Sequence, residues 1–146
     1  MITRRRLESM AQNGAQLEIC GNPTNYAIEL RIYKEFERCC EIAGLIPEEN
    51  IYIEDSAEIR RGKEIILGQA ILSHGDIPYI KVNFNLLRKH LFFLEEIVAH
   101  EVAHVWDFLD NPQEARRYKG HGPAWGYKIG QLGYPARTHI SFKKAA

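Results

Sequence analysis

The residues best suited to chemistry in this chain are His100, Glu101 and His104, which form the pattern H-E-x-x-H (HEVAH). Helical residues four apart lie on one face, so both imidazoles can bind a single metal ion. Glu101 lies about 100° around the helix from His100, within reach of a water on that metal. Zinc lowers the pKa of such a water, and a carboxylate can accept its proton during attack on a carbonyl. The pattern therefore predicts a Zn²⁺ site with Glu101 as general base.

The residues around the motif have the spacing of a buried helix. Histidine and glutamate side chains on such a helix are destabilising unless they are paired or bound to a metal. Glu96 precedes His100 by four residues and is either a side chain that orients a ligand or a solvated helix residue. The apolar positions that define the buried faces are Leu94, Ile97, Val98, Val102, Val105, Trp106 and Leu109.

A catalytic zinc ion takes a third protein ligand and leaves its fourth position to water. We expect His121, in Gly120-His121-Gly122-Pro123, to be this ligand, because it precedes a further helix and can return over the first one. Asp110 is six residues past His104, but a ligand at this spacing needs a glycine turn where this chain has Asp107. Glu114 and His139 are the remaining candidates.

The elements expected around the motif show no βαβ alternation, so they predict an α+β fold. Gly75-Asp76 between two apolar runs is typical of a hairpin turn, so we expect a small antiparallel sheet. Residues 1–22 are an N-terminal tail, either mobile or a loosely docked helix, and residues 23–146 form one domain. The expected elements are a helix at 25–43 with Gly44 as its C-cap, strands at 51–53, 64–72 and 79–83, a short helix at 85–90, a long helix at 91–109, a loop at 111–120 and a helix from 123 to 130.

Composition narrows the class of protein further. The 146 residues are 45% apolar and 26% charged with no net charge, which argues against disordered and coiled-coil classes. No apolar run is long enough to cross a membrane, and the first residues have no secretory pattern. The three cysteines, Cys20, Cys39 and Cys40, form no C-x-x-C pair, so we expect a reducing, cytoplasmic setting (the host cytoplasm if a phage encodes the chain).

Several motifs together resemble the SprT-like zinc metallopeptidases, the group that includes Spartan. HEVAH is followed by GHGPAW and preceded by ILGQAIL and YIKVN, and the resemblance covers about residues 25–133. It implies a minimal zincin-like domain with an N-terminal helix, a small antiparallel sheet, the HExxH helix and a C-terminal helix. It also implies His100, His104 and His121 as zinc ligands, Glu101 as general base, and cleavage of proteins bound or crosslinked to DNA. No cysteine follows Cys40, so the zinc ribbon that many members carry is missing.

We therefore expect a zinc-dependent protease, with two alternatives. One is a narrow-specificity regulatory protease that cleaves a repressor or antitoxin, and the other is a non-catalytic DNA- or protein-binding module stabilised by zinc. Residues 110–146 carry seven basic and two acidic side chains, so this basic region is the candidate for DNA contact, together with Tyr118, Trp125 or Tyr134. We expect no membrane partner. The candidate donors to an oxyanion are Tyr118, Tyr127, Tyr134 and His139.

Overall fold

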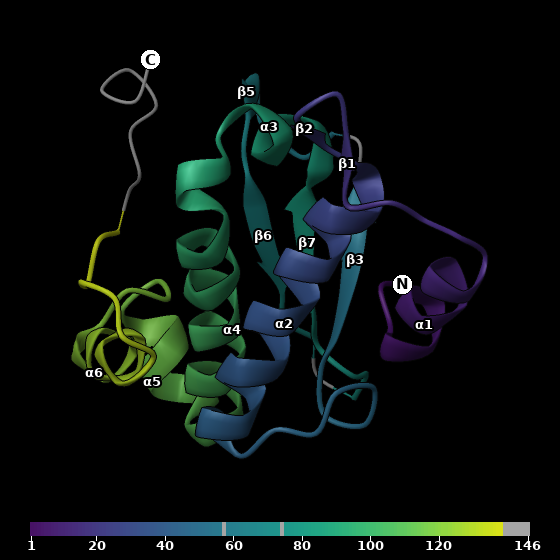
Figure 1. The fold of residues 1–146 in the computed structure, drawn as a ribbon. Helices are drawn as coiled ribbons and strands as arrows, with labels where there is room; N and C mark the ends of the chain where they lie inside the picture. Colours follow the sequence, from purple (N-terminus) through teal and green to yellow (C-terminus); the bar gives the residue numbers. More distant parts are fainter. Residues whose placement is uncertain (57, 74, 139–146) are drawn as a thin grey trace.

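A three-stranded sheet with two long helices across one face forms the centre of the structure (Figure 1), a computed structural model that describes residues 1–56, 58–73 and 75–138. The strand order is β3 (Tyr52–Ser56), β7 (Tyr79–Asn83) and β6 (Gly68–Ile71). Helices α2 (Asn25–Ala43) and α4 (Leu94–Asp110) lie side by side over this sheet. The fold is mixed α+β, as the sequence predicted.

The sheet is mixed, so the expectation of a wholly antiparallel sheet is wrong for one strand. β6 and β7 form the predicted antiparallel pair, with Gly68 opposite Val82 and Ile71 opposite Tyr79. β3, however, runs parallel to β7, with Tyr52 beside Tyr79 and Ser56 beside Asn83. A short turn forces two strands to be antiparallel, whereas β3 reaches β7 through a longer connection that leaves the direction open. A strand has the same alternation of apolar residues whether its neighbour is parallel or antiparallel, so this pattern does not reveal the direction.

Two short hairpins lie outside this sheet. One consists of β1 (Glu18–Ile19) and β2 (Asn22–Pro23). The other consists of β4 (Arg60–Arg61) and β5 (Glu64–Ile65), and it turns at Gly62, whose φ is +62°. This second hairpin lies between β3 and β6 in the chain.

The predicted helices are present, and local residues explain where they begin and end. Thr24 accepts a hydrogen bond from the Ala27 N–H at the start of α2, and Gly44, with a φ of +73°, ends it. α4 follows α3 (Phe84–Lys89) and a 3₁₀ turn at Leu91–Phe93, and it packs against α2, β6 and β7. α6 (Pro123–Gln131) begins with a proline in its first turn.

The segment expected to be a loop at 111–120 instead contains helix α5 (Pro112–Arg117). Asn111 and Pro112 end α4, but the same two residues start α5. The Asn111 side chain accepts a hydrogen bond from the Glu114 N–H, and Pro112 takes a first-turn position where no N–H is needed. The end of a helix at Asn111 and Pro112 is predicted from the sequence, but the start of the next helix at the same residues is not.

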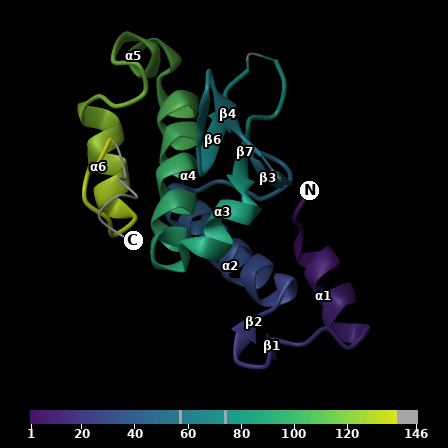
Figure 2. The same ribbon diagram turned by 90° about the horizontal axis from the view of Figure 1, so that it is seen from above.

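Of the two alternatives for the N-terminal residues, the structure has the docked helix, α1 (Arg4–Gln12). Ile2 and Leu7 are buried in the core, and the Ile2 N–H donates to the Ile53 carbonyl oxygen at 2.8 Å. α1 and α6 lie on opposite sides of the molecule (Figure 2). None of the helices in the described part of the chain is long and apolar enough to span a membrane.

Candidate metal centre

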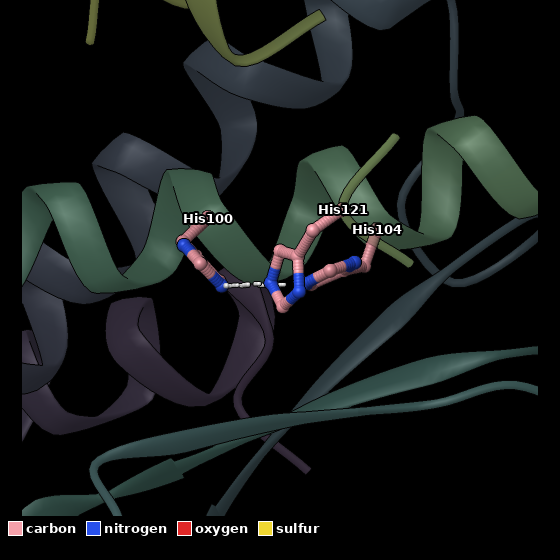
Figure 3. Close-up of side chains that lie close together, drawn as sticks. All are labelled: His100, His104 and His121. Atoms are coloured by element: carbon pink, nitrogen blue, oxygen red, sulfur yellow. Dashed lines mark hydrogen bonds between the residues drawn. The ribbon is translucent and has the colours of Figure 1, made fainter. Parts of the chain in front are cut away.

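Three histidine side chains from two separate segments converge beside the sheet (Figure 3). His100 and His104 project from neighbouring turns of α4, and His121 comes from the loop between α5 and α6. The Nε2 atom of His100 lies 3.2 Å from Nε2 of His104 and 3.4 Å from Nε2 of His121. Tetrahedral zinc with Zn–N bonds of about 2.0–2.1 Å places its nitrogen ligands about 3.3–3.4 Å apart. The two distances from His100 fit this geometry, and all three ligand atoms lie within 4.8 Å of one another.

A close approach of the backbone at Gly120 puts His121 in place. Gly120 has a φ of +83°, and a Cβ there would lie 3.1 Å from Cε1 and 3.2 Å from Nδ1 of His104. The Gly120 N–H donates to the Ala115 carbonyl at 2.7 Å, which ties the loop to α5. Only glycine combines this conformation with this contact at no steric cost.

The same approach orients the His104 ring. A hydrogen bond to the Gly120 backbone raises the pKa of His104, although burial has the larger, opposite effect. Because Nδ1 is the nitrogen nearest Gly120, Nε2 is the one turned toward the other histidines. A backbone hydrogen bond on one ring nitrogen commonly fixes the tautomer that leaves the other free for a metal.

The indole ring of Trp125 packs against all three imidazole rings. Trp125 lies on α6 and is 1% exposed. Its ring stacks on His104 at 5.3 Å between centroids, and it lies 5.0 Å from the His100 ring and 4.8 Å from the His121 ring. It is therefore a wall of the site and not the exposed aromatic for DNA contact that the sequence suggested.

Burial keeps these imidazoles in the neutral form that a metal requires. It lowers the pKa of His100 to about 4 and that of His104 to about 2, and it also lowers the pKa of His121. Electrostatic repulsion also lowers the pKa: His121 acts on His100, both His100 and His121 act on His104, and Arg61 acts on all three.

Glu101 lies next to the triad in a similarly dry environment. It is 6% exposed, and its Oε1 atom is 3.9 Å from Nε2 of His100. Its Oε2 atom has no hydrogen-bond partner among the described residues. Burial raises the pKa of this carboxyl to about 8, and the charge of Arg61 opposes the rise. A buried carboxyl oxygen without a hydrogen-bond partner is destabilising, so its position points to a role in chemistry.

The three histidines and Glu101 face a cavity of about 1210 Å³. β6 forms one wall and passes directly over Glu101, because a Cβ on Gly68 would lie 3.1 Å from Cγ of Glu101. The residues that line the cavity from α4 onward include Ile97, Phe108, Ala115, Arg116, Lys119 and Thr138, and those from the β4–β5 hairpin are Arg61, Glu64 and Ile65.

The alternative third ligands lie elsewhere or outside the described residues. Asp110 pairs with Lys128 at 3.2 Å, and Glu114 pairs with Arg117 at 3.8 Å. Glu96, the proposed orienting residue, pairs with Arg137 at 3.2 Å. His139 lies outside the described ranges. Within those ranges, the histidine triad is the metal-binding group that the structure offers.

The tyrosines expected to stabilise an oxyanion do not line the cavity. The Tyr134 hydroxyl donates to Glu35 at 2.5 Å, Tyr127 is 69% exposed, and Tyr118 packs beneath the Arg117 guanidinium. Arg61, by contrast, lines the cavity. Nothing in the sequence predicts this position, because Arg61 only precedes a glycine in a common type of turn.

The basic C-terminal region divides into side chains with different roles. Arg116 and Lys119 line the cavity, so part of the positive charge is beside the site. Lys128 is buried and pairs with Asp107 and Asp110, so it is not available to a partner. Lys143 and Lys144 lie outside the described residues.

Comparisons with protein-family models, curated proteins and solved structures found no match to this chain. The interpretation of the site therefore depends on the geometry and chemistry of its own residues. Those residues present three neutral nitrogen donors, a buried carboxyl and an adjoining cavity.

Proposed function

We propose that this chain is a zinc-dependent peptidase of the SprT-like type, with His100, His104 and His121 as ligands and Glu101 as general base. One observation carries the proposal. Three imidazoles, with Nε2 of His100 at zinc-ligand separation from the other two, lie beside a buried carboxyl whose Oε2 atom has no hydrogen-bond partner, at the wall of a cavity. A purely structural site would need no such carboxyl.

The donor set favours zinc in a catalytic arrangement. Three imidazoles suit a tetrahedral ion, and three protein ligands leave one position for a water or substrate. No fourth His, Cys, Asp or Glu joins the group among the described residues. This favours a peptidase over a non-catalytic module, whose zinc more often has four protein ligands.

Zinc bound there supplies Lewis acidity, which lowers the pKa of a water molecule, polarises the substrate carbonyl and favours the ionised form of Glu101. Glu101 accepts the proton of the attacking water as the new C–O bond forms. It then delivers that proton to the leaving nitrogen as the C–N bond breaks. The products are a carboxylic acid and an amine.

The cavity wall supports a peptide as the substrate. Among the described strands β6 pairs only with β7, so its other edge has open backbone N–H and C=O groups beside the cavity. An extended peptide can add to such an edge by main-chain hydrogen bonds. Gly68 in this strand packs closely against Glu101, so a peptide added to β6 would lie near that carboxyl.

The positive charge of Arg116 and Lys119, which line the cavity, favours proteins bound to DNA over free repressors or antitoxins as substrates. Basic side chains near the site would hold the phosphate backbone while the attached protein enters the cavity. Activity on a repressor with no effect of DNA would reverse this preference.

The decisive experiment measures zinc content and hydrolysis on the same samples. We expect about one zinc per chain by elemental analysis, and cleavage of a DNA-binding protein that single-stranded DNA stimulates. Glu101→Gln keeps the shape of the side chain but removes its basicity, so this variant should retain zinc and lose hydrolysis. Equal cleavage by Glu101→Gln and the unmodified chain would refute the base assignment, and absence of zinc would refute the centre.

A further inference from the structure

A peptidase site of this kind needs a hydrogen-bond donor for the substrate carbonyl oxygen, where negative charge develops during attack. The three tyrosines among the described candidates do not line the cavity. We propose that Arg61, from the β4–β5 hairpin, donates a hydrogen bond to the carbonyl oxygen of the scissile peptide bond. This inference rests on the proposed function and adds a substrate-binding residue to the same site.

The hairpin carries two adjacent arginines whose side chains differ in their contacts. Arg60 forms an ion pair with Glu58 at 2.6 Å. Arg61 lines the cavity, and its side chain forms no ion pair or hydrogen bond with any described residue. Its cross-strand neighbour Glu64 also lines the cavity without pairing with it. Arg61 is exposed on the cavity wall, so its guanidinium donors are open to solvent and accessible to a ligand.

Arg61 lines the same cavity as His100, Glu101, His104 and His121, so its positive charge adjoins the proposed centre. A positive side chain close to a cation site weakens binding of that cation. An unpaired arginine in this position opposes metal binding, so it is better explained by the substrate than by the metal.

The other basic side chains on the cavity wall fit this role less well. Arg116 lies on α5 and has another interaction partner, which competes with the carbonyl for its donors. Lys119 lies in the loop that positions His121, and it carries a compact charge without the fork of donors that an arginine offers. Arg61 lines the cavity from a different element, the β4–β5 hairpin.

The test compares Arg61→Ala with Arg60→Ala, a matched control on the same hairpin. The probe for metal binding is Zn²⁺ titrated into the apo chain, and the probe for hydrolysis is fluorescein-labelled casein. For Arg61→Ala we expect kcat to fall about 100- to 1000-fold with little change in KM, as for loss of one oxyanion donor. Its zinc affinity should rise about two- to tenfold, an effect that added salt reduces.

The expected fall in kcat and rise in zinc affinity have opposite signs, which separates a role in binding substrate from a role in folding. A variant with a disordered hairpin would lose zinc affinity together with activity, and that result would overturn the inference. Arg61→Lys should keep the zinc affinity of the unmodified chain and recover part of kcat. Guanidinium ion added to Arg61→Ala should also restore part of the activity.

The outcomes also distinguish the inference from the function it rests on. If the unmodified chain binds zinc but cleaves neither casein nor a DNA-bound protein, the proposed function fails and the role of Arg61 fails with it. If the unmodified chain is active and Arg61→Ala has the same kcat, only the inference about Arg61 is overturned. Arg60→Ala should match the unmodified chain in both measurements.

Discussion

Asp107 explains why the third histidine comes from a distant loop. When the third ligand follows the second histidine by only six residues, a glycine at the position of Asp107 would end the helix and turn the chain back at once. Here Asp107 is buried and binds Lys128 at 3.5 Å, and Lys128 also binds Asp110 at 3.2 Å. α4 therefore continues through Asp110, and the carboxylate that could have been a ligand is neutralised by a lysine. The ligand position is left to His121.

At the residue scale, the prediction compares His121→Ala with Asp110→Ala. His121→Ala removes one of three nitrogen donors, so zinc affinity should fall at least about 100-fold, beyond the usual effect of losing an outer partner. Asp110→Ala leaves Lys128 paired with Asp107 and should bind zinc as the unmodified chain does. Competition with a chromophoric chelator measures both affinities. Loss of affinity in Asp110→Ala alone would transfer the ligand role to Asp110.

At the scale of elements, the contact between β6 and α4 shapes the cavity. Gly68 lets the strand pass over the helix, since a Cβ there would lie 3.0 Å from Cγ2 of Ile97 and 3.1 Å from Cγ of Glu101. These contacts are tighter than ordinary van der Waals packing. The edge strand that lines the cavity is therefore also the one that confines the Glu101 side chain.

Gly68→Ala should consequently reduce hydrolysis while zinc binding persists. The added methyl group pushes on Glu101 or lifts β6, and overpacking of this kind typically destabilises a protein by about 1–3 kcal/mol. Gly130→Ala on α6 is the matched control, because a Cβ there meets nothing within 4 Å. It should raise helix stability by about 0.5–1 kcal/mol. Thermal unfolding and casein hydrolysis of the two variants test this; full activity in Gly68→Ala would contradict it.

At the scale of the whole molecule, ion pairs and hydrogen bonds attach the terminal segments to α2. Near the C-terminal end of the described chain, Arg38 donates to the Leu132 carbonyl at 2.7 Å and the Tyr134 hydroxyl donates to Glu35 at 2.5 Å. At the other end, Arg6 on α1 pairs with the buried carboxyl of Glu29. α2 thus connects the sides of the molecule that carry α1 and α6 (Figure 2).

Removing Arg6 should destabilise the fold through Glu29. Burial raises the pKa of Glu29 and Arg6 opposes that rise, so Arg6→Met leaves a carboxyl that is buried and unpaired. Because Arg6 is itself partly exposed, we expect a loss of about 1–2 kcal/mol in the free energy of unfolding. The loss should grow as the pH rises from about 5 to 8, since the folded state must then ionise Glu29 without its partner.

Urea denaturation at several pH values measures this effect. The exposed neighbour Arg5→Met is the control and should have almost no effect. The double variant Arg6→Met/Glu29→Gln should recover much of the stability because the buried charge is gone. An equal, pH-independent loss in the single and double variants would show that Arg6 acts through packing alone.

The sequence alone determined the features that depend on neighbours in the chain. The H-E-x-x-H spacing placed two imidazoles and a carboxyl on one helix, because helical periodicity is local. Thr24, Gly44, Pro112 and Pro123 marked helix ends through capping and steric effects that act within a few residues. The hairpin of β6 and β7 followed from its short turn.

The tertiary structure decided what depends on contacts between distant segments. It made β3 parallel to β7, placed Trp125 behind the histidines and brought Arg61 to the cavity wall. Among the described residues, it also singled out His121 from candidates that the sequence left open. None of these has a local signature, because the position of a side chain in space is set by the packing of the elements that carry it and not by its neighbours in the chain.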